Sequence, residues 1–373
     1  MESTSHLGAQ GADQISFNAN CEQPQRTRLR DITHQQRNGV RQGRPTVSAC
    51  PNVAPAPLSC SSSPTQVRGV GSPQISMHTA AQPPVPAECP VAARPVQLPR
   101  APRAAIEDID AKDVKDVMAV TEYVEDIHAN MRAVENEKHP SAAYMDKQPH
   151  INAKMRAILI DWLVEVHLKF KLVPETLYLT VNLIDRFLET TQVARSKLQL
   201  VGVTALLLAS KYEEIYPPEI RDLVYITDRA YSKTDILCME STMLNKLKFN
   251  LTVPSVGVFL ARYLKAAHAD DKMHHMAHFI AERTLQELRF VKFAPSMLGA
   301  ACVLVARRAL HVQPTWTRTL EHYTQYAERT LEPCVRELME LMAECREGNL
   351  QAVRKKYSSS KFGSVAGIPM RGV

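Results

Sequence analysis

The sequence predicts an all-α protein with two tandem five-helix units, preceded by an N-terminal helix and a disordered N-terminal tail. Three observations support this fold class. From Ile106 onward, Leu, Val, Ile and Met recur at helical spacing. Between residues 106 and 346 we find no alternating run bounded by turn residues, which is the pattern of a half-buried strand. A helix of small residues around a glycine also occurs twice.

Residues 1–104 are rich in proline, serine and glutamine, with few aromatic residues and no apolar run. Such a segment cannot bury enough apolar surface to offset its ordering entropy, so we expect a disordered regulatory tail. The whole chain has a formal net charge of +6, and several arginines cluster in this tail. They lack the interleaved aromatic residues that stack on bases, so they indicate a solvated basic tail and no nucleic-acid partner.

Residues 105–150 are predicted to form an acidic amphipathic helix and a connecting loop. One face of the helix is apolar through Ile109, Val114, Val117, Val120, Val124 and Ile127. Four carboxylates suit the positive end of its dipole, namely Asp108, Asp110, Asp113 and Asp116. Pro140 and Pro149 bracket the loop.

The first unit, residues 151–252, is expected to contain five helices. The first covers about 153–170, the second begins at Pro174, the third covers about 196–212, the fourth follows Pro217-Pro218, and the fifth covers about 232–249. Proline is favoured in a first helical turn, and Ser232 with Asp235 three residues later is typical of an N-cap. The third helix is apolar nearly all round, which predicts a buried central helix.

The second unit, residues 253–350, repeats this pattern. Residues 201–209 and 298–306 are both small-residue helices with glycine at the same place, and basic residues follow both. The offset places the first helix of the second unit near residues 258–263. Any two buried helices look alike, so chance similarity remains an alternative to a true repeat. Residues 351–373 complete the chain as a C-terminal tail.

Little in the sequence indicates catalysis. The eight cysteines have no metal-binding or redox spacing, and the N-terminus lacks a signal-peptide core, which favours a reducing compartment. The longest apolar run, residues 198–209, is shorter than the ~20 residues of a membrane span. Phosphate-binding glycine motifs and a nucleophile elbow are absent. His274 and His278 could pair on one helical face, but we interpret that face as solvated. We expect no catalytic residue, cofactor, metal or membrane contact.

The first predicted helix carries one stripe that is open to two interpretations. Met155, Ile158, Trp162 and Glu165 share a face. Such a stripe is more often core, because large residues such as tryptophan usually fill space. It could instead be a groove for a peptide with one apolar anchor and one arginine.

Residues 155–167, 185–188 and 206–214 resemble the cyclin box, and the resemblance extends over about 106–357. The chain looks like a mitotic cyclin, most like the B type. This implies a non-catalytic subunit that activates a cyclin-dependent kinase as a heterodimer at the G2/M transition, in the nucleus and cytoplasm. The alternatives are an A-type (S/G2) cyclin, a transcription-type cyclin-fold adaptor and the cyclin of a transcriptional kinase.

The resemblance implies roles for individual residues. Arg156 and Asp185 would form a buried ion pair. The kinase would be bound by Lys211, Glu240, Tyr212, Leu244, Phe249, Leu251 and Leu200. Substrates or inhibitors with an RxL motif would dock on Met155, Ile158, Leu159, Trp162, Glu165, Leu198, Gln199 and Asp228. The two acids of this set would receive the arginine of the motif.

The tail contains a segment that resembles a destruction box, the degron read by the anaphase-promoting complex. The matching residues are Arg26, Leu29, Asp31 and Ile32. His34 stands where asparagine is usual. The resemblance implies ubiquitin-mediated degradation. No lysine occurs between Met1 and Ala111, so Lys112 and Lys115 are the first candidate ubiquitin acceptors.

Overall fold

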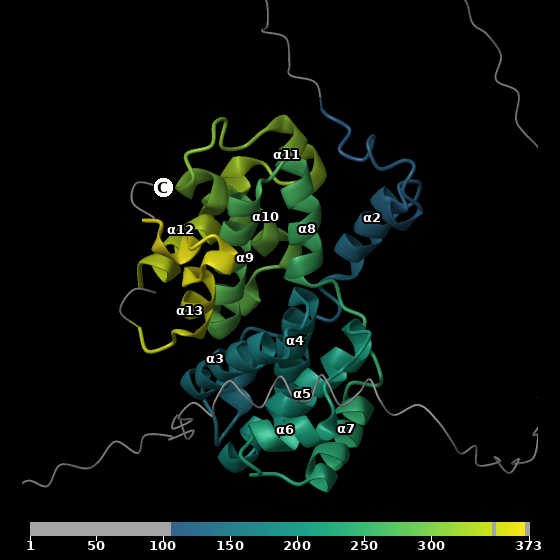
Figure 1. Cartoon of the computed structure of the whole chain (residues 1–373), viewed down its shortest axis with the longest axis vertical. Coiled ribbons are helices and arrows are strands. Elements are labelled where there is room, and N and C mark those ends of the chain that lie inside the picture. The colour runs from purple at the N-terminus through teal and green to yellow at the C-terminus, as the bar shows by residue number, and fades with distance from the viewer. Residues whose placement is uncertain (1–105, 345–347, 370–373) are drawn as a thin grey trace, which may run out of the picture. The chain divides into compact units, whose positions relative to one another are not determined.

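The computed structural model describes residues 106–344 and 348–369, which all belong to one compact unit of the chain, 93–373 (Figure 1). The predicted disordered tail and the destruction-box-like segment lie outside the described residues. Within those residues the chain forms twelve α-helices and no strand, so the all-α prediction is confirmed. Short 3-10 turns are η1 (Val117–Ala119), η2 (Tyr144–Lys147), η3 (Arg195–Lys197), η4 (Leu288–Lys292), η5 (Ser360–Phe362) and η6 (Val365–Gly367).

The N-terminal helix is shorter than predicted. Only α2 (Val124–Val134) is α-helical, whereas residues 106–123 contain turns and η1. The aspartates explain the difference, because their side chains accept backbone N–H groups locally and so compete with a helix. Asp108 accepts from the amide of Asp110 at 2.9 Å, and Asp116 accepts from that of Met118 at 2.9 Å. Ile109 is buried but Val117 is exposed, so the expected apolar face does not form.

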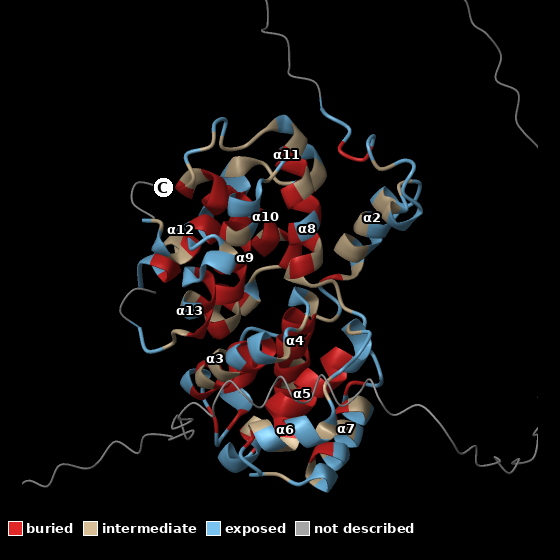
Figure 2. Ribbon diagram, in the orientation of Figure 1, coloured by how far each residue is buried: buried red, intermediate tan, exposed pale blue. Residues whose placement is uncertain are grey.

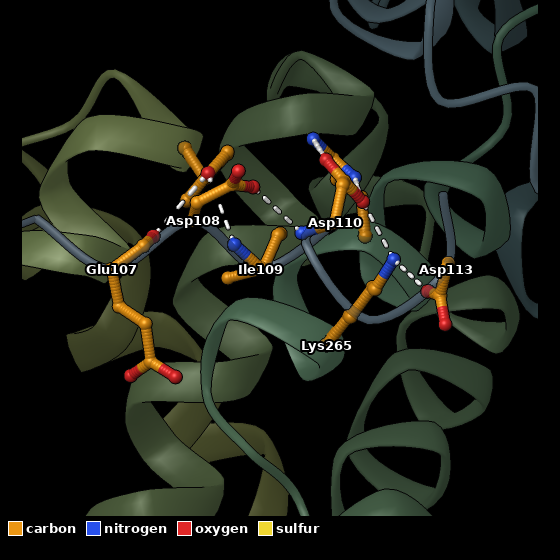
Figure 3. Close-up of polar contacts among 8 residues, drawn as sticks. Glu107, Asp108, Ile109, Asp110, Asp113 and Lys265 are labelled. Carbon is orange, nitrogen blue, oxygen red and sulfur yellow. Dashed lines mark hydrogen bonds and ion pairs between the residues drawn. The ribbon is translucent and has the colours of Figure 1, made fainter. Parts of the chain in front are cut away.

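Residues 107–113 are instead fastened to the second five-helix unit, as Figure 3 shows. Arg262 donates from both terminal nitrogens to the two oxygens of Asp110, each at 2.6 Å. Lys265 donates to Asp110 at 2.6 Å and pairs with Asp113 at 2.5 Å. These contacts, above all the hydrogen bonds from Arg262, hold the pKa of Asp110 below its usual value. We call residues 107–113 the acidic strap.

The first unit contains the five predicted helices. They are α3 (Ala153–Phe170), α4 (Pro174–Thr190), α5 (Leu198–Glu213), α6 (Ile220–Ile226) and α7 (Lys233–Lys246). Pro174 occupies the first turn of α4, and Ser232 and Asp235 form a capping box at α7. The central helix α5 is buried along nearly all its length (Figure 2). Asn152, whose side chain accepts from the amide of Met155 at 3.0 Å, starts α3.

The second unit repeats this arrangement, as predicted. Its helices are α8 (Val256–Ala266), α9 (Asp271–Gln286), α10 (Pro295–Ala309), α11 (Arg318–Thr324) and α12 (Glu328–Glu344). The central helix is α10, which packs against α8, α9 and α12 (Figure 1). In both units a small-residue helix is thus surrounded by the others.

The C-terminal segment contains α13 (Ala352–Ser358), which the sequence pattern did not predict. It packs against α3 of the first unit and α9 of the second. Val353 and Tyr357 are fully or almost fully buried in the core of the second unit. The amide of Ala352 donates to Asp161 on α3 at 2.9 Å, so this segment braces the two units.

Candidate functional site

Arg156 of α3 and Asp185 of α4 form a buried ion pair. The guanidinium donates from Nε at 2.7 Å and from Nη2 at 2.6 Å to the two carboxylate oxygens. Its Nη1 donates to the carbonyl of Leu285 in the second unit at 2.9 Å, and the Tyr144 hydroxyl donates to Asp185 at 2.7 Å. Burial and the neighbouring carboxylate raise the pKa of Tyr144. These charges lie in an apolar core because every one is paired, and their role here is to join helices.

Lys211 and Glu240 form an ion pair in which the lysine is open to solvent, the two side chains being 45% and 12% exposed. Lys211 is near the end of α5, Glu240 is on α7, and their Nζ and Oε1 atoms are 2.6 Å apart. Tyr212 in the last turn of α5 and Phe249 just after α7 are both exposed. Phe249 has a left-handed backbone with φ of 56°, which is rare for a bulky residue and marks a local constraint.

Two further apolar residues extend this surface. Ile215 and Tyr216, in the loop after α5, are 87% and 90% exposed. Large apolar side chains in this state cost free energy unless a partner covers them, so they favour a protein interface. Our sequence interpretation missed both residues. The available signal was a pair of large apolar residues directly before Pro217-Pro218, where a loop would otherwise be polar.

The remaining residues predicted to bind a kinase are less accessible. Leu244 and Leu251, which precede and follow the exposed Phe249 in the chain, are half-buried. Leu200 is only 2% exposed and packs with Val203 and Leu207 under α6 and α7. Leu200 therefore lies beneath the accessible surface of this structure, and its contact with a partner stays a prediction. Because α5 is apolar on every side, spacing alone could not show which of its residues reach the surface.

The docking stripe divides into a buried and an accessible layer. Met155, Leu159 and Leu198 are buried, so they lie beneath the surface that a peptide could contact in this structure, and their direct contact with a peptide stays a prediction. Ile158, Trp162 and Gln199 are half-buried, and Glu165 and Asp228 are exposed. Trp162 packs its inner side against the cluster that contains Leu200. The accessible surface on α3 is therefore an apolar ledge of Ile158 and Trp162 with the carboxylate of Glu165 on the same helix.

Of the histidine pair on α9, His274 is exposed as we interpreted, but His278 is not on a solvated face. The rings of His274 and His278 lie 4.6 Å apart, but His278 is buried. Burial lowers the pKa of His278 to about 3, which keeps the ring neutral. Among the described residues no group of three or more His, Cys, Asp or Glu side chains could hold a metal ion.

Other features complete the survey of the described part of the chain. Lys112 and Lys115 are both exposed, within and just after the acidic strap. Cys238, Cys302 and Cys334 are free thiols. No helix among residues 106–344 and 348–369 is long and apolar enough to cross a membrane.

Comparison with known proteins connects the two units to two sequence families. The family described as "Cyclin, N-terminal domain" matches residues 126–252, and "Cyclin, C-terminal domain" matches residues 254–371. Among solved structures, the fold is similar to a viral cyclin from herpesvirus saimiri. That match has a TM-score of 0.53 at 20% identity and covers 58% of this chain and 96% of the viral chain.

Curated relatives are more similar in sequence. The chain is 50% identical over 261 residues to Cyclin-B1-2 of Arabidopsis thaliana, which covers 70% of this chain and 58% of the relative. It is 48% identical over 244 residues to the G2/mitotic-specific cyclin S13-7 of Glycine max, which covers 65% of this chain and 95% of the relative. The match to Cyclin-B1-3 of Arabidopsis thaliana is 51% identical over 259 residues and covers 69% of this chain and 62% of that relative. The chain thus spans less than two thirds of the length of either Arabidopsis relative.

Proposed function

The chain belongs to the cyclin family, among its B-type members, and from this we propose that it is the non-catalytic regulatory subunit of a cyclin-dependent protein kinase. In this proposal the two proteins form a heterodimer that acts at the G2/M transition, in the nucleus and cytoplasm. The observation that best supports a kinase partner is the Lys211–Glu240 pair, whose lysine is open to solvent, with Tyr212 exposed in the last turn of α5 and Phe249 exposed just after α7.

Activation would work by a shift in population. A kinase that exchanges between inactive and active conformations is activated by a partner that binds the active one more tightly. Moving such an equilibrium from 1:99 to 99:1 requires about 5.5 kcal/mol of differential affinity. A standard interface of about 1,600 Å² with a few well-packed anchors can supply it. Tyr212 and Phe249 are suited to be anchors, while Lys211 and Glu240 can hydrogen-bond the partner's backbone.

The kinase partner is tested with the double substitution Lys211→Ala and Glu240→Ala. We expect the melting temperature to stay near wild type and kinase affinity to fall about 30-fold or more, which corresponds to about 2 kcal/mol. The matched control is Lys292→Ala with Glu337→Ala, a surface pair at the same 2.6 Å separation on the second unit. Co-purification and a protein-kinase assay provide the readout. An unfolded double variant, or one that activates the kinase normally, would refute the assignment.

We also propose that the ledge of Ile158, Trp162 and Glu165 recruits RxL-bearing substrates or inhibitors. The ledge supports this because it places a carboxylate beside half-buried apolar side chains, which matches one arginine and one leucine. Trp162→Ala should weaken phosphorylation of an RxL-bearing substrate but leave activity on a short peptide without RxL unchanged. Equal loss on both substrates would mean that Trp162 serves only the core.

The last part of the proposal is degradation through the anaphase-promoting complex and ubiquitin. The exposure of Lys112 and Lys115 and the lack of lysine before them support these two as the first acceptors. In mitotic extract, Arg26→Ala with Leu29→Ala should stabilise the protein. A variant with arginine at five lysines should be lost more slowly, the five being Lys112, Lys115, Lys138, Lys147 and Lys154. If that variant disappears as fast as wild type, ubiquitin is placed elsewhere.

A further inference from the structure

The C-terminal segment brings a concentration of positive charge to the docking ledge. Residues 352–361 contain four cationic side chains and no acid, the cations being Arg354, Lys355, Lys356 and Lys361. The first three of these lie on α13, which packs directly against α3, the helix that carries the ledge (Figure 1). A cation of α13 that lies beside the ledge can therefore act on a peptide that docks there.

Contacts with α9 and α3 fix the position of α13. Lys356 is buried and pairs with Glu282 of α9 at 2.6 Å. The hydroxyl of Tyr357 donates to the same carboxylate oxygen at 2.7 Å. At the start of the helix, the amide of Ala352 donates to Asp161 of α3 at 2.9 Å. Removing either partner of a buried charge pair is costly, so the helix does not drift from this position.

Lys355, the neighbour of the buried lysine, points to solvent beside the ledge. Its Nζ lies 3.8 Å from Oε1 of Glu165, and the two side chains are 72% and 54% exposed. Glu165 is the carboxylate that would receive the arginine of a docking peptide. An arginine that binds there must therefore share Glu165 with a lysine that the fold keeps in place.

We propose that Lys355 sets the specificity of the docking ledge by weakening its preference for arginine. This inference rests on the proposed docking function and adds a residue from outside the ledge. With Lys355 present, Glu165 is partly neutralised, and the leucine anchor contributes a larger share of the selectivity. Without Lys355, the ledge should discriminate more strongly between a peptide with arginine and one with a neutral residue at that position.

The size of the effect follows from the exposure of the pair. Exposed ion pairs change binding or stability about 1.4- to 5-fold, and a like charge beside the site acts with similar strength. Removing Lys355 should therefore raise the ratio of the two peptide affinities about two- to fivefold. The increase should become smaller in 1 M salt, where charges are screened within about 3 Å.

The experiment measures the binding of two labelled peptides, identical except for RxL or AxL, to the full chain by fluorescence anisotropy. The proteins are wild type, Lys355→Met, Lys361→Met and Trp162→Ala. Lys361 is the matched control, because it is an exposed lysine of the same segment whose ammonium lies over the Phe362 ring. Glu165→Gln, alone and with Lys355→Met, completes a double-mutant cycle. Melting temperatures confirm that each variant folds.

We expect Lys355→Met to raise the affinity ratio, Lys361→Met to leave it unchanged, and the effect of Lys355→Met to become smaller with Glu165→Gln, where only the direct repulsion between Lys355 and the arginine is removed. If Trp162→Ala weakens both peptides but Lys355→Met leaves the ratio at the wild-type value, the inference about Lys355 is overturned while docking stands. If Trp162→Ala weakens neither peptide, the docking function fails, and this inference fails with it.

Discussion

The ends of the two central helices, α5 and α10, show how one repeated fold serves two purposes. Each helix ends in a cation that pairs with the fifth helix of its unit. Lys211 pairs with Glu240 of α7, and Arg308 lies 3.0 and 3.1 Å from Glu328 and Glu332 of α12. The side chain of Lys211 is 45% exposed, whereas that of Arg308 is only 19% exposed. The first pair is open to a partner on its lysine side, since Glu240 is only 12% exposed, whereas Arg308 is enclosed and its two carboxylates, 39% and 49% exposed, face solvent.

The loops after α5 and α10 also differ, because the first is exposed and the second is bonded to its own unit. After α5, the loop exposes Ile215 and Tyr216. After α10, it folds back, because Arg307 donates to the carbonyls of Thr315 at 2.9 Å and Pro314 at 2.8 Å. The acidic strap also covers α8 of the second unit with its own ion pairs. The comparison teaches that the first unit retains unsatisfied surface for a partner, while the second satisfies its charges internally.

The largest expected effect lies at the joint between the units. Arg156→Met leaves Asp185 buried without its cation and removes the hydrogen bond to Leu285. Breaking one partner of a buried pair costs about 3–5 kcal/mol. Urea unfolding followed by circular dichroism should show that loss. Arg221→Met is the control, since Arg221 forms only exposed pairs and should change stability by less than about 0.5 kcal/mol. A small effect of Arg156→Met would show that the joint does not hold the units together.

The comparison of helix ends predicts a large loss of stability for one basic residue and a small one for another. Arg307→Ala removes hydrogen bonds from a charged group to three carbonyls, including that of Ala267 at 3.1 Å. At about 1.5–3 kcal/mol for a charged hydrogen bond, incompletely additive, we expect a loss of about 3 kcal/mol. Lys211→Ala should change stability by less than about 0.5 kcal/mol. Unfolding free energies compare them directly, and equal losses would contradict the distinction between an open and a closed end.

The acidic strap should stabilise the second unit in a pH-dependent way. The hydrogen bonds from Arg262 depress the pKa of Asp110, so its contribution is present above the unfolded value of about 3.9 and is lost as pH falls below it. Asp110→Asn should cost about 1–2 kcal/mol at pH 7. The difference from wild type should stay constant down to about pH 5 and shrink below about pH 4.

Tryptic cleavage after Lys112 and Lys115 should also become faster when the strap is released. Asp126→Asn is the control, because Asp126 is exposed on α2 and outside the strap. A pH-independent difference between wild type and Asp110→Asn would mean that shape, and not charge, holds the strap.

Local signals explain what the sequence could predict. Pro174, Ser232 and Asp235 act within a turn of where they stand, so the starts of α4 and α7 were predictable. Asp110 acts at long range, since its partners Arg262 and Lys265 lie more than 150 residues away. We therefore wrongly interpreted the segment around Asp110 as helical.

The surface residues were harder to predict for a related reason. On α5, the buried Leu200 and the exposed Lys211 differ because of the helices packed around them, and an all-apolar stretch does not encode its packing side. The short α13 depends on contacts with Glu282 and Asp161, which come from α9 and α3. Its own seven residues carry too few apolar positions to reveal a period.

The smallest expected effect concerns the two equivalent glycines of the central helices. Alanine in a helix interior is favoured over glycine by about 0.5–1 kcal/mol. A Cβ on Gly202 would lie only 2.7 Å from Cδ1 of the fully buried Leu159, whereas a Cβ on Gly299 would lie 3.4 Å from Cβ of Phe259. Overpacking a core costs about 1–3 kcal/mol. Gly202→Ala should therefore destabilise by about 1 kcal/mol, and Gly299→Ala should be neutral or slightly stabilising.

The cause can be separated by relieving the close contact. Leu159→Val shortens the side chain that faces Gly202, so adding Gly202→Ala to that background should cost less than it does alone. A coupling of about 0.5 kcal/mol or more in this double-mutant cycle, measured by urea unfolding, would locate the effect at the contact between α3 and α5. If both glycine variants lose equal stability and no coupling is found, the two central helices are packed alike, and the difference between the units is confined to their ends.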